Sequence, residues 1–135
     1  MIYTPDTWPT DWPNFSWNEM KCSHTGICDL GEDMMCSLQD LRDTYGKPLK
    51  VTSGYRHPTH PVETRKALPG SHTTGKAVDL AVSRREAHEV LRLALWGGWT
   101  GIGIKQHGEG RFLHLDILEP GEVGHITRPA LWSYS

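Results

Sequence analysis

The chain lacks any run of about 18 apolar residues, which is the length that a membrane-spanning helix requires. Residues 1–17 are rich in proline, aspartate and tryptophan, and they lack the basic and then apolar segments of a secretory signal. We therefore expect no membrane span and no signal peptide, and we expect synthesis in the cytoplasm. A substrate outside the cytoplasm would then require another exit route, such as a holin-type export partner or lysis.

An excess of positive charge is also missing, since 14 Lys and Arg face 16 Asp and Glu, for a formal net charge of -2. Nucleic-acid binding depends on a cationic surface, so we expect no nucleic-acid partner. The sequence has no internal repeat, and its 135 residues suit one ordinary domain. We expect that domain to act as a monomer.

Cysteine is scarce, and the odd count of 3 excludes a complete disulfide framework. Cys22 and Cys28 are expected as a disulfide or as plain thiols, and the state of Cys36 is left open. A partial metal site made of Cys22, His24 and Cys28 is an alternative, although its spacing fits no well-defined ligand pattern. The chain is instead rich in histidine (8) and tryptophan (6), which supply metal ligands and flat aromatic surfaces.

Two kinds of signal predict three helices. Ser16 and Glu19 form an S-x-x-E capping box that predicts a short helix through about Lys21, after an N-terminal segment whose aromatic residues cover the core. Apolar residues at spacings of four, three and four predict a helix over 32–45. A second capping box, at Ser83 and Glu86, predicts a helix that stops before Gly97.

Strands are expected at 50–56, 77–82, 99–105 and 112–118, the last two as an antiparallel hairpin. The stretch 57–71 has three prolines and a glycine and reads as a long loop. The tail from Gly121 to Ser135 is expected to be a loop anchored by Trp132. These elements together predict an α+β fold with a small antiparallel sheet and flanking helices.

Three residues form a candidate metal site. Catalytic zinc takes three protein ligands and leaves a fourth position for water. His72 is followed by a turn that Gly75 permits and then by Asp79, which lies on the uncrowded face of the strand over 77–82. The third ligand is His114, which shares a strand face with Asp116 because side chains alternate with a period of two.

The same residues carry a resemblance to a known family. Ser53-Gly-Tyr-Arg56, Ser71-His-x-x-Gly-x-Ala-x-Asp79 and His114-x-Asp116 resemble the D-alanyl-D-alanine carboxypeptidase family of zinc peptidases. That family belongs to a wider group named for lysostaphin, D-Ala-D-Ala peptidases and hedgehog domains. Further segments resemble small phage-endolysin-like members, so that the likeness spans nearly the whole chain. They are Phe15–Cys22, Gly101–Ile104 and Thr127–Tyr134.

The resemblance implies a hedgehog/DD-peptidase-like zinc fold forming a single zinc peptidase domain over 1–135. In it, 1–15 is an N-terminal wrapping segment and 119–135 a C-terminal loop segment. It implies Zn2+ on His72, Asp79 and His114, and hydrolysis of peptidoglycan stem peptides in the periplasm or cell wall after release. No further cofactor is expected.

The resemblance also implies roles around the metal. Arg56 matches an arginine that binds substrate carboxylate or steadies the oxyanion. Substrate binding is further expected from Ser53, His57 and Trp132.

The catalytic carboxylate of several relatives stands three residues before the last histidine, where this chain has Arg111. Asp116 is therefore the expected general base, with Glu109 as runner-up. A role for Asp116 in orienting a ligand is the alternative.

Two cleavages are compatible with this site. We favour an L-alanyl-D-glutamate endopeptidase, because a compact chain without insertions should leave an open cleft. The alternatives are a D-alanyl-D-alanine carboxypeptidase and, since hedgehog domains use the scaffold in signalling, a non-catalytic zinc-containing binding module.

Overall fold

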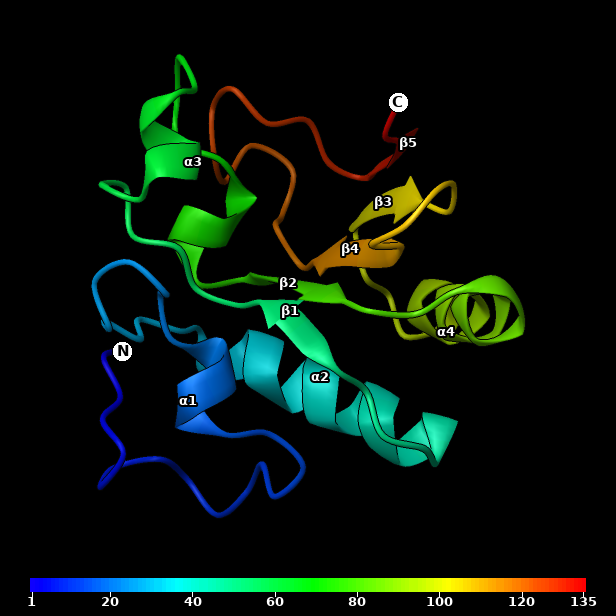
Figure 1. Ribbon diagram of the computed structural model, residues 1–135, viewed down its shortest axis with the longest axis horizontal. Coiled ribbons are helices and arrows are strands. Elements are labelled where there is room, and N and C mark those ends of the chain that lie inside the picture. The colour runs from blue at the N-terminus through cyan, green and yellow to red at the C-terminus, as the bar shows by residue number, and fades with distance from the viewer.

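A computed structural model describes all 135 residues and contains one five-stranded sheet of order β1-β2-β4-β3-β5 (Figure 1). The strands are β1 (Val51–Ser53), β2 (Ala77–Leu80), β3 (Gly101–Lys105), β4 (Phe112–Asp116) and β5 (Ala130–Ser133). The helices are α1 (Trp17–Met20), α2 (Glu32–Tyr45), α3 (Pro61–Thr64) and α4 (Arg84–Trp96), with a 3₁₀ helix η1 (Ser71–Thr74). The predicted α+β class is confirmed.

The helices divide between the two faces of the sheet. α2 and α4 lie below the sheet in the view of Figure 1, and α3, η1 and the C-terminal segment lie above it. Side chains that point down from the strands join a core cluster of 26 buried residues, which includes Val78, Leu80 and Leu115. Side chains that alternate with them, such as Asp79 and His114, point up. The upper face is therefore the polar one.

Two of the predicted helices have the expected ends. The Ser16 side chain accepts from the Glu19 N–H while the Glu19 side chain accepts from the Ser16 N–H, so the capping box of α1 is formed. α2 covers the predicted range and ends at Gly46, whose left-handed backbone (φ 75) suits a residue without a side chain.

The start of α4 differs from the expectation. Ser83 stands at the N-cap position, but its side chain makes no capping hydrogen bond. The Arg84 N–H donates instead to the Gln106 side chain, at 3.2 Å. A partner from the far end of the β3–β4 hairpin thus replaces the local cap, and the apolar face of α4 still packs on the core as predicted. Its buried members are Ala87, Val90, Leu93 and Ala94.

Three expectations for the connecting segments need correction. The stretch 57–71 is not one long loop, because it contains α3, where Pro61 occupies the first turn and the His60 side chain accepts from the Val62 N–H. The tail 121–135 contains β5, which pairs in parallel with β3, so the sheet is mixed and not purely antiparallel. Pairing between distant segments leaves no local signal in a strand of four residues. The predicted strands are also two to four residues longer than those observed.

The cysteines are plain thiols. Cys22 and Cys28 are buried, Cys36 is exposed, and none forms a disulfide. Burial raises the pKa of the Cys28 thiol to about 12, with a further contribution from Asp29. None of the helices has both the length and the hydrophobicity that a membrane span requires.

Candidate metal centre

One row of residues crosses the upper face of the sheet from edge to edge. Successive strand pairings align Ser53 with Asp79, Asp79 with His114, His114 with Gly103, and Gly103 with Trp132. Paired residues on neighbouring strands lie about 5 Å apart, so the row brings together residues from all five strands. Two of the three predicted metal ligands stand at its centre.

The third ligand reaches the row from η1. Gly75 ends this short helix with a left-handed backbone, and a Cβ there would meet the Leu30 Cα at 3.0 Å. Only glycine turns the chain this closely against the neighbouring segment, which sends it directly into β2. η1 thereby holds His72 over Asp79 and His114, and the predicted group of ligands is confirmed as a cluster able to bind a metal.

The donor atoms of the three ligands form a nearly equilateral triangle. His72 Nε2 lies 3.2 Å from Asp79 Oδ1, His114 Nδ1 lies 3.1 Å from the same oxygen, and the two nitrogens are 3.2 Å apart. Bonds of about 2.0–2.1 Å to a tetrahedral Zn2+ place neighbouring donors about 3.3 Å apart. Two imidazoles and one carboxylate at this spacing fit zinc and leave its fourth position to water.

Hydrogen bonds on the outer side of each histidine select the tautomer that a metal needs. His72 Nδ1 lies 2.8 Å from the Gly54 carbonyl oxygen, and His114 Nε2 lies 2.8 Å from Asp116 Oδ2. Each of these nitrogens donates its proton to the oxygen, which leaves the lone pair of the other ring nitrogen facing the centre. Both rings are buried, with exposed fractions of 5% and 3%.

The charges of the centre are set by these contacts. Burial alone would raise the pKa of Asp79, but the neighbouring His114 and His72 rings outweigh it and hold that pKa well below its usual range. Burial would likewise lower the pKa of His114, yet its bonds to Asp116 and Asp79 raise it. Asp79 is therefore ionised and able to act as an anionic ligand.

Asp116 sits on the side of His114 that faces away from the other ligands. Its carboxylate accepts from His114 Nε2 and also receives a two-pronged contact from Arg128, with Nε–Oδ1 2.8 Å and Nη2–Oδ2 2.6 Å. Burial raises the pKa of Asp116, but Arg128 and His114 together lower it to about 2. This geometry favours the ligand-orienting role over the role of general base. No sequence motif indicated that Arg128 would bind Asp116.

Trp132 forms the wall of the centre on the β5 side. Its ring lies 5.2 Å from that of His114, and the Arg128 guanidinium lies 5.0 Å from the Trp132 ring. The indole fits because the row has a glycine beside it, since a Cβ on Gly103 would come within 2.7 Å of the Trp132 ring. The expected place of Trp132 beside the substrate is compatible with this position.

Arg56 and Ser53 lie at the opposite end of the row. The Arg56 side chain is anchored at two points, with Nη2 donating to Ser53 Oγ at 3.0 Å and Nη1 donating to Glu63 Oε2 at 2.8 Å. Its backbone N–H donates to the His72 carbonyl oxygen at 3.2 Å. The predicted substrate-binding arginine is thus tied to the turn that carries the first ligand. No sequence motif indicated the involvement of Glu63.

The remaining predicted residues lie further from the ligands. The His57 ring contacts Thr59 Oγ1 at 2.8 Å, within its own loop. Glu109 is exposed in the β3–β4 turn and makes no side-chain contact with the ligands. Arg111, in place of the expected carboxylate, donates to the Gly108 carbonyl oxygen at 3.0 Å.

A His–Asp–His triangle held by a turn and two neighbouring strands, with its outer nitrogens fixed, defines the centre of a zinc hydrolase. The chain belongs to the peptidase M15 family, whose sequence model matches residues 13–116. No curated protein and no solved structure gives a significant match. Family membership and the metal centre together make this chain a zinc-dependent peptidase that acts on peptidoglycan.

Proposed function

We propose that the protein is an endopeptidase that cuts the bond between L-alanine and D-glutamate in peptidoglycan stem peptides. A D-alanyl-D-alanine carboxypeptidase is the alternative within the same family. Both substrates share one chemical feature, because the residue on the amine side of the cut bond carries a free carboxylate next to the scissile nitrogen. They differ beyond that carboxylate, since a terminal D-alanine ends the chain and D-glutamate continues it through its side-chain carboxyl group.

The observation that carries the proposal is a groove that continues past Arg56. It has a volume of about 290 Å³ and runs along the outer edge of β1 to α1. A terminal D-alanine would need no room beyond its carboxylate, whereas a stem peptide attached to D-glutamate would occupy such a groove. The residues that line it are mostly polar, as the peptide substrate requires, and include Lys21, Ser23, Ser53, Arg56 and His60.

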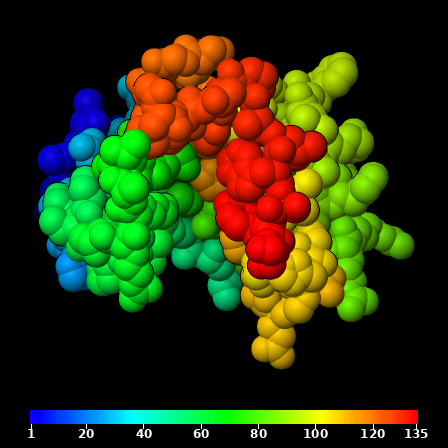
Figure 2. Space-filling view, turned by 90° about the horizontal axis from the view of Figure 1, so that it is seen from above, coloured from blue at the N-terminus to red at the C-terminus, as the bar shows by residue number.

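Access to the metal face supports the same proposal. In Figure 2 the segment around α3 and the C-terminal segment stand on either side of a recess. They meet where His125 Nε2 donates to the Pro69 carbonyl oxygen at 2.7 Å. No inserted domain covers the recess, which suits an internal bond of a polymer.

In this function each part of the centre has a defined task. Bound zinc supplies a water of lowered pKa and a positive charge on the scissile carbonyl oxygen. Asp116 and the Gly54 carbonyl orient the two histidines, and Arg56 binds the substrate carboxylate. We further propose that the protein acts in the periplasm or cell wall, where this substrate lies.

Mass spectrometry of muropeptides after digestion tests the proposal, because each cleavage gives a distinct product mass. We expect products that begin with D-glutamate, no release of free D-alanine, and loss of all cleavage with a chelator that zinc then reverses. Release of terminal D-alanine alone would establish the carboxypeptidase instead. Intact muropeptides with a zinc-loaded protein would favour a binding module.

A further inference from the structure

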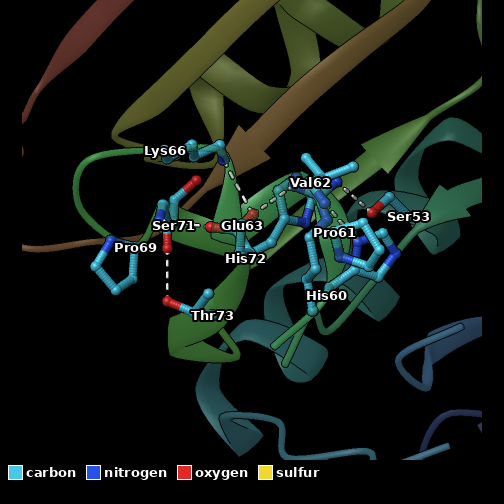
Figure 3. Close-up of polar contacts among 12 residues, drawn as sticks. Ser53, His60, Pro61, Val62, Glu63, Lys66, Pro69, Ser71, His72 and Thr73 are labelled. Carbon is cyan, nitrogen blue, oxygen red and sulfur yellow. Dashed lines mark hydrogen bonds and ion pairs between the residues drawn. The ribbon is translucent and has the colours of Figure 1, made fainter. Parts of the chain in front are cut away.

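Glu63 is a buried carboxylate that the metal centre does not use. Its side chain is 1% exposed, and apart from Asp116 it is the only buried acidic residue. Three donors surround it, as Figure 3 shows in part. Arg56 Nη1 (2.8 Å) and Lys66 Nζ (3.0 Å) donate to Oε2, and the Gly70 N–H (2.8 Å) donates to Oε1.

These contacts keep Glu63 charged. Burial would raise its pKa, but the hydrogen bonds from Arg56, Gly70 and Lys66 lower it to about 2. A buried carboxylate is costly unless it is fully paired, so its presence calls for a reason beyond packing. That reason is found in the segments to which Arg56 and Gly70 belong.

The first donor, Arg56, is held so that part of its guanidinium stays free. A guanidinium has five N–H groups, of which one donates to Glu63 and one to Ser53. Glu63 binds Nη1 and Ser53 binds Nη2, so the plane of the guanidinium is fixed by two anchors. The other N–H groups have no acceptor within the protein and are available to a ligand. Ser53 is the row neighbour of Asp79, which sets this free edge beside the metal ligands.

The third donor ties the same carboxylate to the metal centre. Gly70 immediately precedes η1, the helix that carries His72, and its carbonyl accepts from Thr73 Oγ1 at 2.7 Å. Glu63 therefore contacts both the arginine and the start of the ligand-bearing turn. One rigid carboxylate fixes the spacing between them.

We infer that Glu63 is a positioning residue that holds the Arg56 guanidinium at a set distance from the metal, so that the enzyme selects substrates with a free carboxylate beside the scissile nitrogen. This inference rests on the proposed function. It deepens that function, because it predicts discrimination against peptides in which the same carboxylate is amidated. Two N–H groups of Arg56 match two carboxylate oxygens, whereas a carboxamide offers one acceptor and one clashing donor.

The test compares kcat and KM for two peptides, L-Ala-γ-D-Glu-L-Lys and the same peptide with D-isoglutamine in place of D-glutamate. A pair ending in D-Ala-D-Ala, as acid and as amide, is measured in parallel. We expect the wild type to prefer the acid, and Glu63→Gln to lower the acid-to-amide ratio of kcat/KM roughly tenfold through KM, since one charge-assisted contact is weakened. A loss of stability alone would affect both peptides equally.

Matched variants separate positioning from other effects. Lys66→Ala removes a partner of Glu63 but leaves Arg56 in place. Glu122→Gln removes an ion pair with Lys76 at 2.9 Å, elsewhere in the protein. Neither variant should change the acid-to-amide ratio of kcat/KM. Adding Glu63→Gln to Arg56→Ala should lower the ratio no further. Glu63→Asp, which keeps the charge but withdraws it from Arg56, replaces Glu63→Gln if the latter does not fold.

Each outcome has a distinct meaning. If the wild type cleaves the peptides and the Glu63 variants have the same acid-to-amide ratio of kcat/KM as the wild type, the role of Glu63 is overturned and the proposed function stands. Cleavage of only the D-Ala-D-Ala pair would overturn the proposed bond, and the ratio test then applies to that pair. Cleavage of neither pair would overturn both.

Discussion

Gly101 leaves the space that the Asp116 carboxylate fills. The two residues are partners across β3 and β4, and a Cβ at Gly101 would overlap both Asp116 carboxylate oxygens. Gly103 does the same for the Trp132 ring, so alternate glycines of β3 clear the metal face while Ile102 packs into the core. The Gly-Ile-Gly-Ile segment is thus a requirement of the centre above it.

Gly101→Ala should weaken zinc binding without touching a ligand. Asp116 would have to move away from His114, and loss of such an outer partner reduces metal affinity by about 10–100-fold. Competition with a chromogenic chelator measures the affinity. Gly124→Ala is the control, because nothing lies within 4 Å of its added Cβ. Equal zinc affinities in wild type and Gly101→Ala would contradict this role of Gly101.

Asp116→Asn distinguishes the two roles weighed for that residue. An orienting carboxylate predicts a fall in zinc affinity of roughly tenfold or more, with kcat partly restored at saturating zinc. A general base predicts unchanged zinc affinity and a kcat about 10²–10⁴-fold lower at any zinc concentration. We expect the first result, because Asp116 contacts the ring nitrogen that points away from the metal.

Arg128→Met should destabilise the protein by about 3 kcal/mol, since it leaves a fully buried Asp116 charge without its strongest partner. Urea unfolding of the zinc-free protein gives this value. Arg92→Met removes an ion pair with Glu89 at 3.5 Å whose arginine side chain is 62% exposed, so we expect under about 1 kcal/mol there. Similar losses for both variants would show that Arg128 does not stabilise the buried charge.

Stability should fall in acid partly because of Glu63. Its folded pKa of about 2 lies below the ordinary value of 4.5, so its contribution is complete above about pH 4.5 and disappears as the pH falls towards 2. We expect the unfolding free energies of wild type and Glu63→Gln to differ by on the order of 2 kcal/mol at neutral pH and to converge in acid. A gap independent of pH would refute the assignment of a charged, paired Glu63.

Local patterns predicted the parts of the protein that depend on neighbouring residues. The spacing of apolar residues and Gly46 gave α2 its full length, and the period of two put His114 and Asp116 on one face. The Ser71–Asp79 motif predicted two ligands because one short turn connects them.

Contacts between segments that are distant in the sequence could not be predicted from local patterns. The sequence of β5, Ala-Leu-Trp-Ser, does not alternate between apolar and polar residues, and the strand is defined by its pairing with β3. Arg128 reaches Asp116 only because β5 brings the C-terminal segment back over the sheet. The strand pattern places Asp116 and His114 on one face, which favoured Asp116 as the general base. A shared face does not reveal which ring nitrogen of His114 the carboxylate contacts.

The row from Ser53 to Trp132 has a consequence for the stage of folding at which the site is completed. Its members are separated by most of the sequence, and all five strands must pair before the row exists. Long-range pairing of this kind is completed late in folding. A chain emerging from the ribosome, or one shortened before β5, would contain the zinc ligands and still lack the Trp132 wall and the Arg128 support of Asp116. Hydrolytic competence is therefore expected to appear only once β5 has been synthesised and has paired with β3.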